Sequence, residues 1–289
     1  MGLNTAPQHP LRGIALVVGA TLCFALLDTT SQYVGALVPV LMAVWMRWLT
    51  QTLMTTLLLW PQQGRQLLRM HSPRLHLLRG LLLLSSSTAA FLSLVYIPVG
   101  EFTALMMTIP LLVTVLAAPM LGERTARLTW PLLAGGLVGA LLVIRPRGGE
   151  LSWSLLLPLA VVLFNAATQL LTSHMVKTED PGAIHFYTGI VGLVASTAVL
   201  PWAWQPLANG ALWGLAALIG VFSSLGHYLL IRSYHHAPVS RLMPYLYAQI
   251  GFATLAGWLV FDHAPDAWTW LGMGLIVLCG LVGVRSRMQ

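Results

Sequence analysis

The sequence predicts an all-α polytopic membrane protein in which ten transmembrane helices form two inverted five-helix repeats. Hydrophobic residues make up 57% of the 289 positions and charged residues only 8%, whereas soluble domains contain about 25% charged residues. Apolar segments of about 20 residues, the length that crosses a bilayer, follow one another with short polar connections. The second half of the chain also repeats features of the first at a constant offset of 140 residues, as Thr129-Trp130 and Thr269-Trp270 show.

Each apolar segment is expected to be helical, because lipid offers no hydrogen-bond partners to an open backbone. The expected spans cover residues 13–35, 40–60, 77–97, 101–120, 128–145, 152–175, 183–203, 210–232, 238–260 and 267–285. The first five belong to a repeat over residues 1–147, and the last five to a repeat over residues 148–289. Because each repeat holds an odd number of helices, the second enters the membrane from the opposite side. Inverted repeats of this kind are typical of secondary transporters.

The distribution of positive charge predicts that both termini are cytoplasmic. With the N-terminus inside, 12 of the 15 Arg and Lys residues lie in cytoplasmic segments, two lie in outside loops, and Arg47 lies within a helix. Cytoplasmic loops of membrane proteins carry an excess of Lys and Arg. The same distribution argues against nucleic acid as a partner, because the basic residues are spread between apolar segments instead of forming one patch. Their expected partner is the lipid bilayer.

Two stretches of sequence around the fourth and fifth spans resemble a known family. The residues Pro98-Val99-Gly100-Glu101-Phe102-Thr103-Ala104-Leu105, Pro110 and Leu121-Gly122-Glu123-Arg124 before Trp130 resemble the EamA family of the drug/metabolite transporter superfamily. The second repeat is similar over Ala237-Pro238-Val239-Ser240 and over Phe261–Pro265. It departs from the family at Asp262-His263, where a Gly-Glu pair is usual. The resemblance implies that Glu123 has a structural role in its turn, as a capping or pairing residue.

The resemblance also implies a class of function. The family consists mainly of exporters of amino acids and amino-acid-derived metabolites, including some opine-type metallophores, while some relatives import vitamins or nucleotides. We therefore expect an exporter of small amino-acid-like metabolites in a bacterial cytoplasmic (inner) membrane, working by alternating access. The alternative is an importer of a vitamin, nucleotide or related metabolite, or a uniporter or facilitator.

Asp28 and Arg47 are candidate substrate-binding residues, because an ionisable side chain at the centre of a membrane helix costs about 2.5–3.5 kcal/mol on insertion scales. Both lie equally far from the turn at Leu37-Val38, and therefore at the same depth in the membrane. One interpretation is a structural ion pair. The other is a carboxylate that binds a substrate amine or a proton, with Arg47 adjusting its proton affinity. Their counterparts in the second repeat, Thr168 and Tyr187, are uncharged, and this asymmetry favours a functional role.

Polar residues in the sixth span form a stripe that is either a contact between helices or the wall of a cavity. Spacings of three and four residues place them on one face: Asn165, Thr168, Gln169, Thr172 and Ser173. The small residues Ser85-Ser86-Ser87-Thr88 and Ser223-Ser224 occupy related positions in the third and eighth spans. They are expected to allow close helix approach, or else to line a pore.

Prolines interrupt the fourth and ninth spans at corresponding places, which indicates a transporter site. Tyr245, Tyr247 and Gln249 follow Pro244 there, where they would either contact an amphipathic substrate or pack in the interior. The candidate substrate-binding residues are therefore Asp28, Arg47, Asn165, Gln169, Tyr187, Ser224, Tyr245 and Gln249.

Proton coupling is expected at Asp28, with His185 and His227 as further candidates for a gate or a proton relay. Both histidines lie near the cytoplasmic ends of their spans, where they would otherwise be interface residues. No pair among the nine His residues has the one-face spacing of a zinc site, so we expect no metal and no cofactor. A phosphate-binding loop of the Walker type is absent, and no cluster of acid, base or metal ligands suggests an enzyme.

Overall fold

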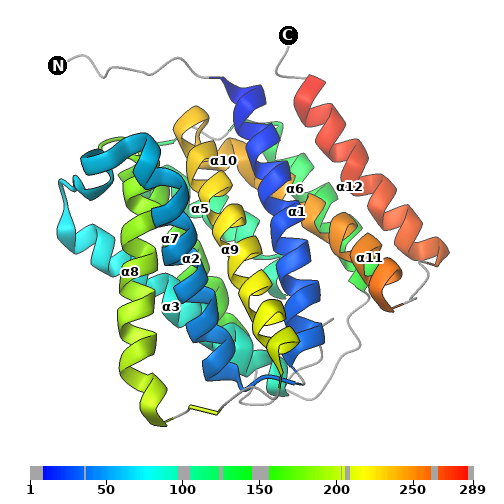
Figure 1. Ribbon diagram of the computed structural model, residues 1–289. Helices are drawn as coiled ribbons and strands as arrows, with labels where there is room; N and C mark the ends of the chain where they lie inside the picture. Colours follow the sequence, from blue (N-terminus) through cyan, green and yellow to red (C-terminus); the bar gives the residue numbers. More distant parts are fainter. Residues whose placement is uncertain are drawn as a thin grey trace, which may run out of the picture.

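The computed structural model describes residues 9–35, 37–96, 105–123, 126–144, 156–202, 204–205, 209–261 and 266–285, and within these ranges the chain is helical without strands (Figure 1). The helices are α1 (Pro10–Gly35), α2 (Val40–Gln63), α3 (Pro73–Tyr96), α5 (Ile109–Leu121), α6 (Thr129–Ile144), α7 (Leu156–Met175), α8 (Pro181–Val199), α9 (Gly210–His236), α10 (Val239–Leu242), α11 (Ala248–Phe261) and α12 (Ala267–Arg285). Short 3₁₀ helices cover Gly64–Leu68 (η1), Leu200–Trp202 (η3) and Met243–Tyr247 (η4). The all-helical prediction is confirmed.

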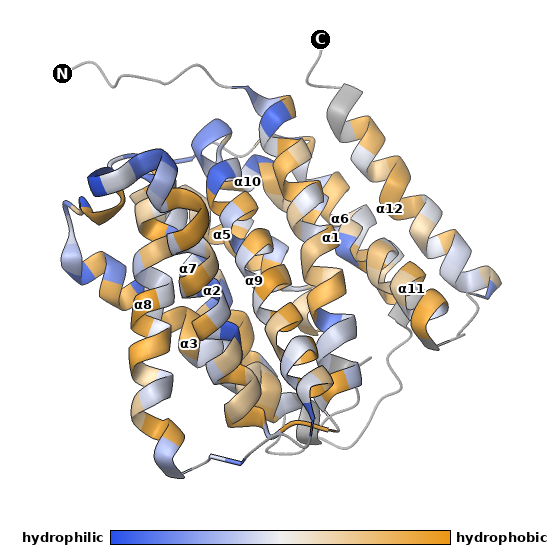
Figure 2. Cartoon of the chain, in the orientation of Figure 1, coloured by the Kyte–Doolittle hydropathy of each residue, from blue (hydrophilic) through white to orange (hydrophobic). Residues whose placement is uncertain are grey.

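Among the described residues, five helical segments are long and apolar enough to cross a membrane. They are Pro10–Gly35, Pro73–Ser93, Leu156–Met175, Pro181–Trp202 and Gly210–His236, and α5, α6 and α12 contain shorter apolar stretches. Large apolar side chains cover the outside as well: Leu57 is 71% exposed and Leu259 is 83% exposed. Hydrophobic residues accordingly predominate along most of the ribbon (Figure 2). Such a surface is stable in lipid, so the protein is a multi-pass membrane protein.

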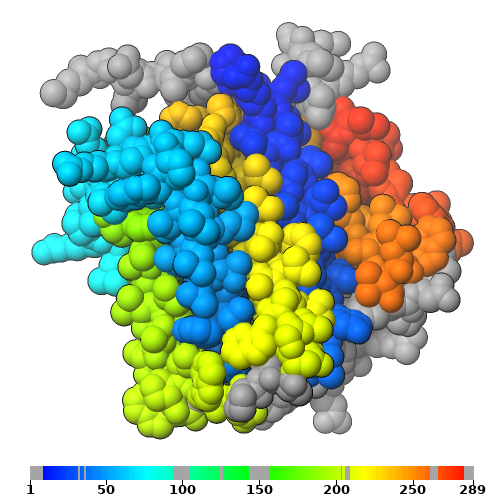
Figure 3. Space-filling view, viewed as in Figure 1, coloured from blue at the N-terminus to red at the C-terminus, as the bar shows by residue number. Residues whose placement is uncertain are grey.

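The helices of the two halves of the chain pack against each other throughout. α1 packs on α9 and α11, while α3 packs on α7 and α8. α2 packs on α8 and α9, α5 packs on α7, and α6 packs on α12. On the face shown in Figure 3, α2, α9 and α1 lie side by side. α1 begins and α12 ends at one face of the molecule (top in Figure 1), which we call the termini face.

Two helices are interrupted at positions 140 residues apart. A turn at Met107-Thr108 precedes α5, and Pro110 occupies the first turn of that helix. In the second half, η4 contains Pro244 and separates α10 from α11. The Tyr247 hydroxyl donates a hydrogen bond to the Met107 carbonyl oxygen at 3.1 Å, so the two interruptions contact each other. Pro110 begins a helix here instead of kinking one, because it lacks an N–H group and its fixed φ suits a first turn.

Glycines allow close helix contacts, and one of them gives a stability prediction. A Cβ atom at Gly192 in α8 would overlap the indole ring of Trp48 in α2, a fully buried side chain. We expect Gly192→Ala to lower the free energy of unfolding by about 1–3 kcal/mol, the usual cost of overpacking. Gly214→Ala in α9 is the matched control, because nothing lies within 4 Å of a Cβ atom there. Thermal unfolding in detergent would contradict the prediction if both variants were as stable as the wild type.

Several residues singled out above lie outside the described residues. These are the Pro98–Ala104 part of the family-like stretch, Arg124, the outside-loop residues Arg145 and Arg147, and the Asp262-His263 departure.

Candidate substrate-binding cavity

A cavity of about 240 Å³ lies between the helices of the two halves. α1, α2 and α3 contribute polar lining residues from the first half, and α7, α9 and α11 contribute them from the second. They are Asp28, Ser31, Arg47, Arg79, Ser86, Ser87, Asn165, Thr168, Gln169, Thr172, His227, Tyr234 and Gln249. Apolar side chains such as Phe24, Leu83, Phe91 and Met106 form the rest of the wall. The cavity therefore combines a few polar groups with an apolar surface, as sites for small molecules do.

Asp28 contributes a carboxylate to this cavity from α1. Its Oδ2 atom accepts a hydrogen bond from Gln249 Nε2 at 2.7 Å, which joins α1 to α11. Asp28 is an exposed residue and lines the cavity. A carboxylate with one fixed partner and open space beside it retains acceptor capacity for another group.

Arg47 is buried, with 4% of its surface exposed, and it is held by hydroxyl groups. Its Nε atom donates to Ser223 Oγ in α9 at 2.6 Å, and its Nη1 atom donates to Ser87 Oγ in α3. The guanidinium carbon also lies 4.7 Å from the centre of the Trp48 ring. Among the described residues, ion pairs form only at Glu179. The interpretation of Asp28 and Arg47 as a direct ion pair is therefore wrong: α3 and α9 supply nearer partners for Arg47.

Arg79 is a second buried guanidinium in the cavity wall, and sequence reasoning missed it as a site residue. It is 2% exposed. Its Nε atom donates to Thr172 Oγ1 in α7 at 2.7 Å, and its Nη1 atom donates to Thr188 Oγ1 in α8. The predicted span begins at residue 77, only two residues before Arg79, so the charge distribution assigns Arg79 to the cytoplasmic side. α3 instead begins at Pro73, so Arg79 lies more than a turn inside the helix.

The polar stripe of α7 forms part of the cavity wall and is hydrogen-bonded along its length. Gln169 Nε2 donates to Asn165 Oδ1 at 2.7 Å, and the Tyr234 hydroxyl of α9 donates to Gln169 Oε1 at 2.9 Å. Ser173, at the end of the stripe, is buried but does not line the cavity. The amide groups of Asn165 and Gln169 are thus held in fixed orientations beside the space that a ligand would occupy.

Three candidate substrate contacts lie outside the cavity wall. Ser224 is hydrogen-bonded to His185 Nε2 at 2.9 Å, while its neighbour Ser223 accepts a hydrogen bond from Arg47. The Tyr187 hydroxyl donates to the Leu68 carbonyl oxygen at 2.9 Å. Tyr245 lies in the 3₁₀ turn η4 and is 4% exposed.

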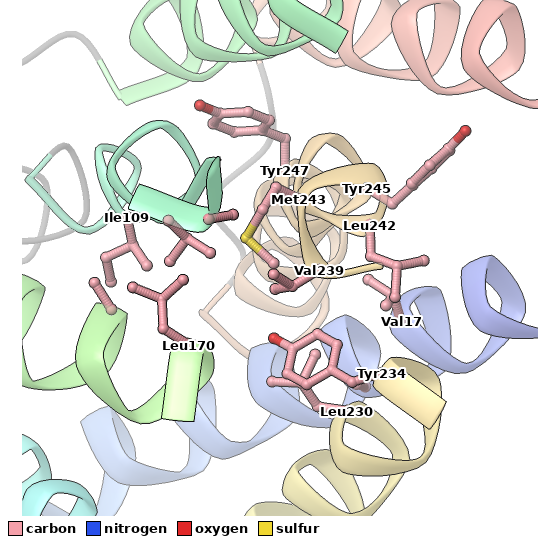
Figure 4. Packing of buried hydrophobic residues seen from close by; sticks show 14 of the residues in the cluster. Val17, Ile109, Leu170, Leu230, Tyr234, Val239, Leu242, Met243, Tyr245 and Tyr247 are labelled. Atoms are coloured by element: carbon pink, nitrogen blue, oxygen red, sulfur yellow. The ribbon is translucent and has the colours of Figure 1, made fainter. Parts of the chain in front are cut away.

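In Figure 4 the ring of Tyr245 points away from Ile109 and Leu170. Tyr187, Ser224 and Tyr245 were predicted to bind substrate, and none of them lines this cavity. Of the two histidines, His227 lines the cavity, packs edge-on to Phe24 with ring centroids 4.9 Å apart, and interacts through Nδ1 with the Ser223 carbonyl oxygen at 2.8 Å. His185 does not line it.

Two carboxylate clamps join the halves of the chain at the termini face. Glu179, between α7 and α8, accepts hydrogen bonds from the backbone N–H groups of Ser72 at 2.8 Å and His71 at 3.0 Å. Its Oε2 atom also lies 3.4 Å from His76 Nε2. Burial of this carboxyl group favours its neutral form, but the hydrogen bonds outweigh that effect and lower the pKa of Glu179.

Glu123, after α5, forms the other clamp with the N–H groups of Val239 at 3.2 Å and Ser240 at 3.0 Å. It therefore caps α10 in the second half of the chain.

Comparisons with known proteins agree with this architecture. The model of the EamA-like transporter family matches residues 11–145 and again residues 152–285. A riboflavin transporter of Rhizobium johnstonii is 27% identical over 99% of this chain and 95% of its own length. The pseudopaline exporter of Pseudomonas aeruginosa is 29% identical over 95% of this chain and 96% of its own length. One crystal structure at 18% identity superposes with a TM-score of 0.78, covering 94% of this chain and 98% of the other, which shows a shared fold. The chain therefore belongs to the EamA-like transporter family, as a transporter of a bacterial membrane and not an enzyme.

Proposed function

We propose that this protein is a proton-driven secondary transporter that exports small amino-acid-like or amino-acid-derived metabolites by alternating access. One observation carries the proposal: a single cavity contains both a carboxylate, Asp28, and buried guanidinium groups, Arg47 and Arg79. Amino-acid derivatives carry an ammonium group and a carboxylate, which these side chains complement. Asn165, Gln169 and Gln249 add neutral hydrogen-bonding groups that would fix the orientation of the substrate.

The arrangement of the helices supports alternating access between two inverted repeats of five spans each. The counterparts of α1, α2 and α3 in the second half are α7, α8 and α9. The contact of α1 with α9 therefore has a counterpart in the contact of α7 with α3, and the contact of α2 with α9 has one in the contact of α8 with α3. In the contacts of α2 with α8 and of α6 with α12, each helix packs against its own counterpart. The family model matches each half once. In transporters built this way, substrate binds between the repeats at interrupted helices, and this cavity includes Met107 and Pro110 from one interruption.

Asp28 supplies a reason for export. One carboxylate cannot bind a proton and a substrate ammonium group at the same time, so the two compete for it. Because Asp28 would face one side of the membrane at a time, this competition leads to exchange of a proton on one side for a substrate molecule on the other. An inward proton gradient would then drive substrate outward, with both termini in the cytoplasm.

The clamps at Glu123 and Glu179 supply a gate on the termini face. Each links one half of the chain to the other through backbone N–H groups. Movement of one half against the other has to break them, so in this proposal they hold the cytoplasmic side closed.

Proteoliposomes that contain the purified protein test the proposed function. With an acidic lumen and a neutral medium, labelled amino-acid derivatives should accumulate inside as protons leave, and accumulation should stop when an ionophore collapses the pH difference. Flux that only equilibrates and ignores the gradient would indicate a facilitator instead.

A vitamin is the second candidate substrate, since Phe24 and Phe91 offer an apolar wall to a planar molecule and one relative is a riboflavin transporter. Riboflavin belongs in the same flux experiment. Transport of riboflavin without transport of any amino-acid derivative would replace the first proposal by the second.

A further inference from the structure

We propose that the cavity is built for a substrate with two acidic groups, one bound at Arg47 and the other at Arg79. This inference rests on the proposed function and specifies its substrate class: an amino-acid derivative with a second carboxylate. Its basis is that the cavity holds two buried guanidinium groups and only one carboxylate, Asp28, among the described lining residues.

Both guanidinium groups are held in the same manner, by two hydroxyl groups from two different helices. Ser223 and Ser87 hold Arg47, and Thr172 and Thr188 hold Arg79. Three of these hydroxyls donate their own hydrogen to a backbone carbonyl oxygen one turn earlier: Ser87 to Leu83, Thr172 to Thr168 and Thr188 to Ile184. This bond directs a lone pair of each oxygen toward the arginine. The hydroxyls therefore orient the guanidinium groups, but they provide no negative charge.

A buried cation without an anion is unfavourable, because desolvation costs far more than hydroxyl groups return. No described carboxylate forms an ion pair with either arginine, and Asp28 is hydrogen-bonded to Gln249. Asp28 balances at most one of the two charges. The described wall of the cavity thus lacks one anion even when Asp28 is ionised, and it lacks two when Asp28 holds a proton or the substrate ammonium group.

The geometry of the guanidinium groups also leaves them able to bind carboxylates. Arginine has five N–H donors in a planar fork, and two are used at each residue. The remaining three can form the paired hydrogen bonds that arginine makes with carboxylates. Arg47 and Arg79 lie on different helices, α2 and α3, so two acidic groups at separate positions of one molecule fit better than one group shared between them.

The experiment compares two probes that differ only in the second acidic group. N-(1-carboxyethyl)leucine has an amine and two carboxylates, and N-isopropylleucine has a methyl group in place of the second carboxylate. Their binding to the purified protein in nanodiscs is measured by calorimetry. Wild-type protein should bind the dicarboxylate at least about tenfold more tightly, as expected for hydrogen bonds to charged groups.

Arg79→Gln should abolish this preference while still binding the monocarboxylate. Arg74→Gln is the matched control, because Arg74 is an exposed residue of the same helix and its loss should leave the preference intact. If Arg79→Gln does not fold, Thr172→Val serves instead: it removes one of the two hydroxyls that orient Arg79 and should reduce the preference.

Equal binding of the two probes by the wild type, or an unchanged preference in both the Arg79 and Thr172 variants, would overturn the inference and leave the proposed function standing. Binding of neither probe by the wild type, together with transport of riboflavin, would overturn both.

Discussion

Replacement of Asp28 by Asn is expected to reduce proton-driven accumulation of substrate by about 100-fold or more while the protein still folds. Loss of a charged partner from a buried contact costs about 2–5 kcal/mol, and each 1.4 kcal/mol corresponds to a tenfold change in binding. Asn has nearly the size of Asp and keeps an oxygen that can accept the hydrogen bond from Gln249. It cannot bind a proton or pair with an ammonium group, so both ligands of the proposed exchange lose their site.

Flux and stability must be measured together, because a buried charge can also be structural. Arg47 has its own hydroxyl partners in Ser223 and Ser87, so the melting temperature of Asp28→Asn should remain close to that of the wild type. Asp266→Asn is a matched control at a carboxylate that bonds Thr269 at the start of α12. Wild-type flux with unchanged pH dependence in Asp28→Asn would eliminate the coupling role. If Asp28→Asn misfolds and the added substitution Arg47→Gln restores folding, the two charges have a structural role instead.

The sequence predicted the helices and some of the cavity, since both follow from local patterns. Long apolar segments can only be helices in lipid, and spacings of three and four residues suffice to place Asn165 and Gln169 on one face of α7. Asp28 and Arg47 were identifiable because ionisable residues are rare within such segments. Each of these arguments needs only the residue and its neighbours along one helix.

The partners of these residues could not be predicted, because they depend on how the helices rotate and cross. Arg47 contacts α3 and α9 instead of Asp28 on α1, the preceding helix in the sequence. The rotation of α9 decides that Ser223 contacts Arg47 and that Ser224 contacts His185. Arg79 was missed for a related reason: the first turns of α3 are polar, so hydropathy placed the beginning of the helix too late. The sequence did carry one signal of its role: Arg79 lies just inside an apolar span and is followed by Gly80.

The clamps of Glu123 and Glu179 illustrate the same limit. The family resemblance assigned Glu123 a local role in its turn, yet its partners lie more than 100 residues away, at Val239 and Ser240. Glu179 carried no pattern of its own, because a single acidic residue between two helices usually serves as a solvated loop residue or a cap. Asp180, the next residue, does cap α8 through the N–H groups of Gly182 and Ala183.

Replacement of Glu179 by Gln is expected to open the termini face. The Glu179 carboxylate accepts hydrogen bonds from His71 and Ser72, and hydrogen bonds to a charged group are worth about 1.5–3 kcal/mol. Loss of the charge should therefore shift the gate toward the open state by about 10- to 100-fold. A cysteine at Leu230, which lines the cavity, reports the shift in a background without Cys23 and Cys279. An impermeant maleimide added from the termini face should label it faster in Glu179→Gln.

The pH dependence of this labelling distinguishes a clamp from a general loosening of the structure. Because the clamp lowers the pKa of Glu179, its contribution is complete above the ordinary pKa of a carboxyl group and is lost as the pH falls through the lowered value. Maleimide reacts with the thiolate and therefore slows in acid, so wild-type labelling is expressed relative to that of Glu179→Gln at each pH. This ratio should be low at neutral pH and should rise toward one as the pH falls. Asp180→Asn is the matched control, since it removes the neighbouring charge but keeps a good helix cap. Equal labelling of Glu179→Gln and Asp180→Asn at neutral pH would show that the Glu179 contacts do not hold the gate closed.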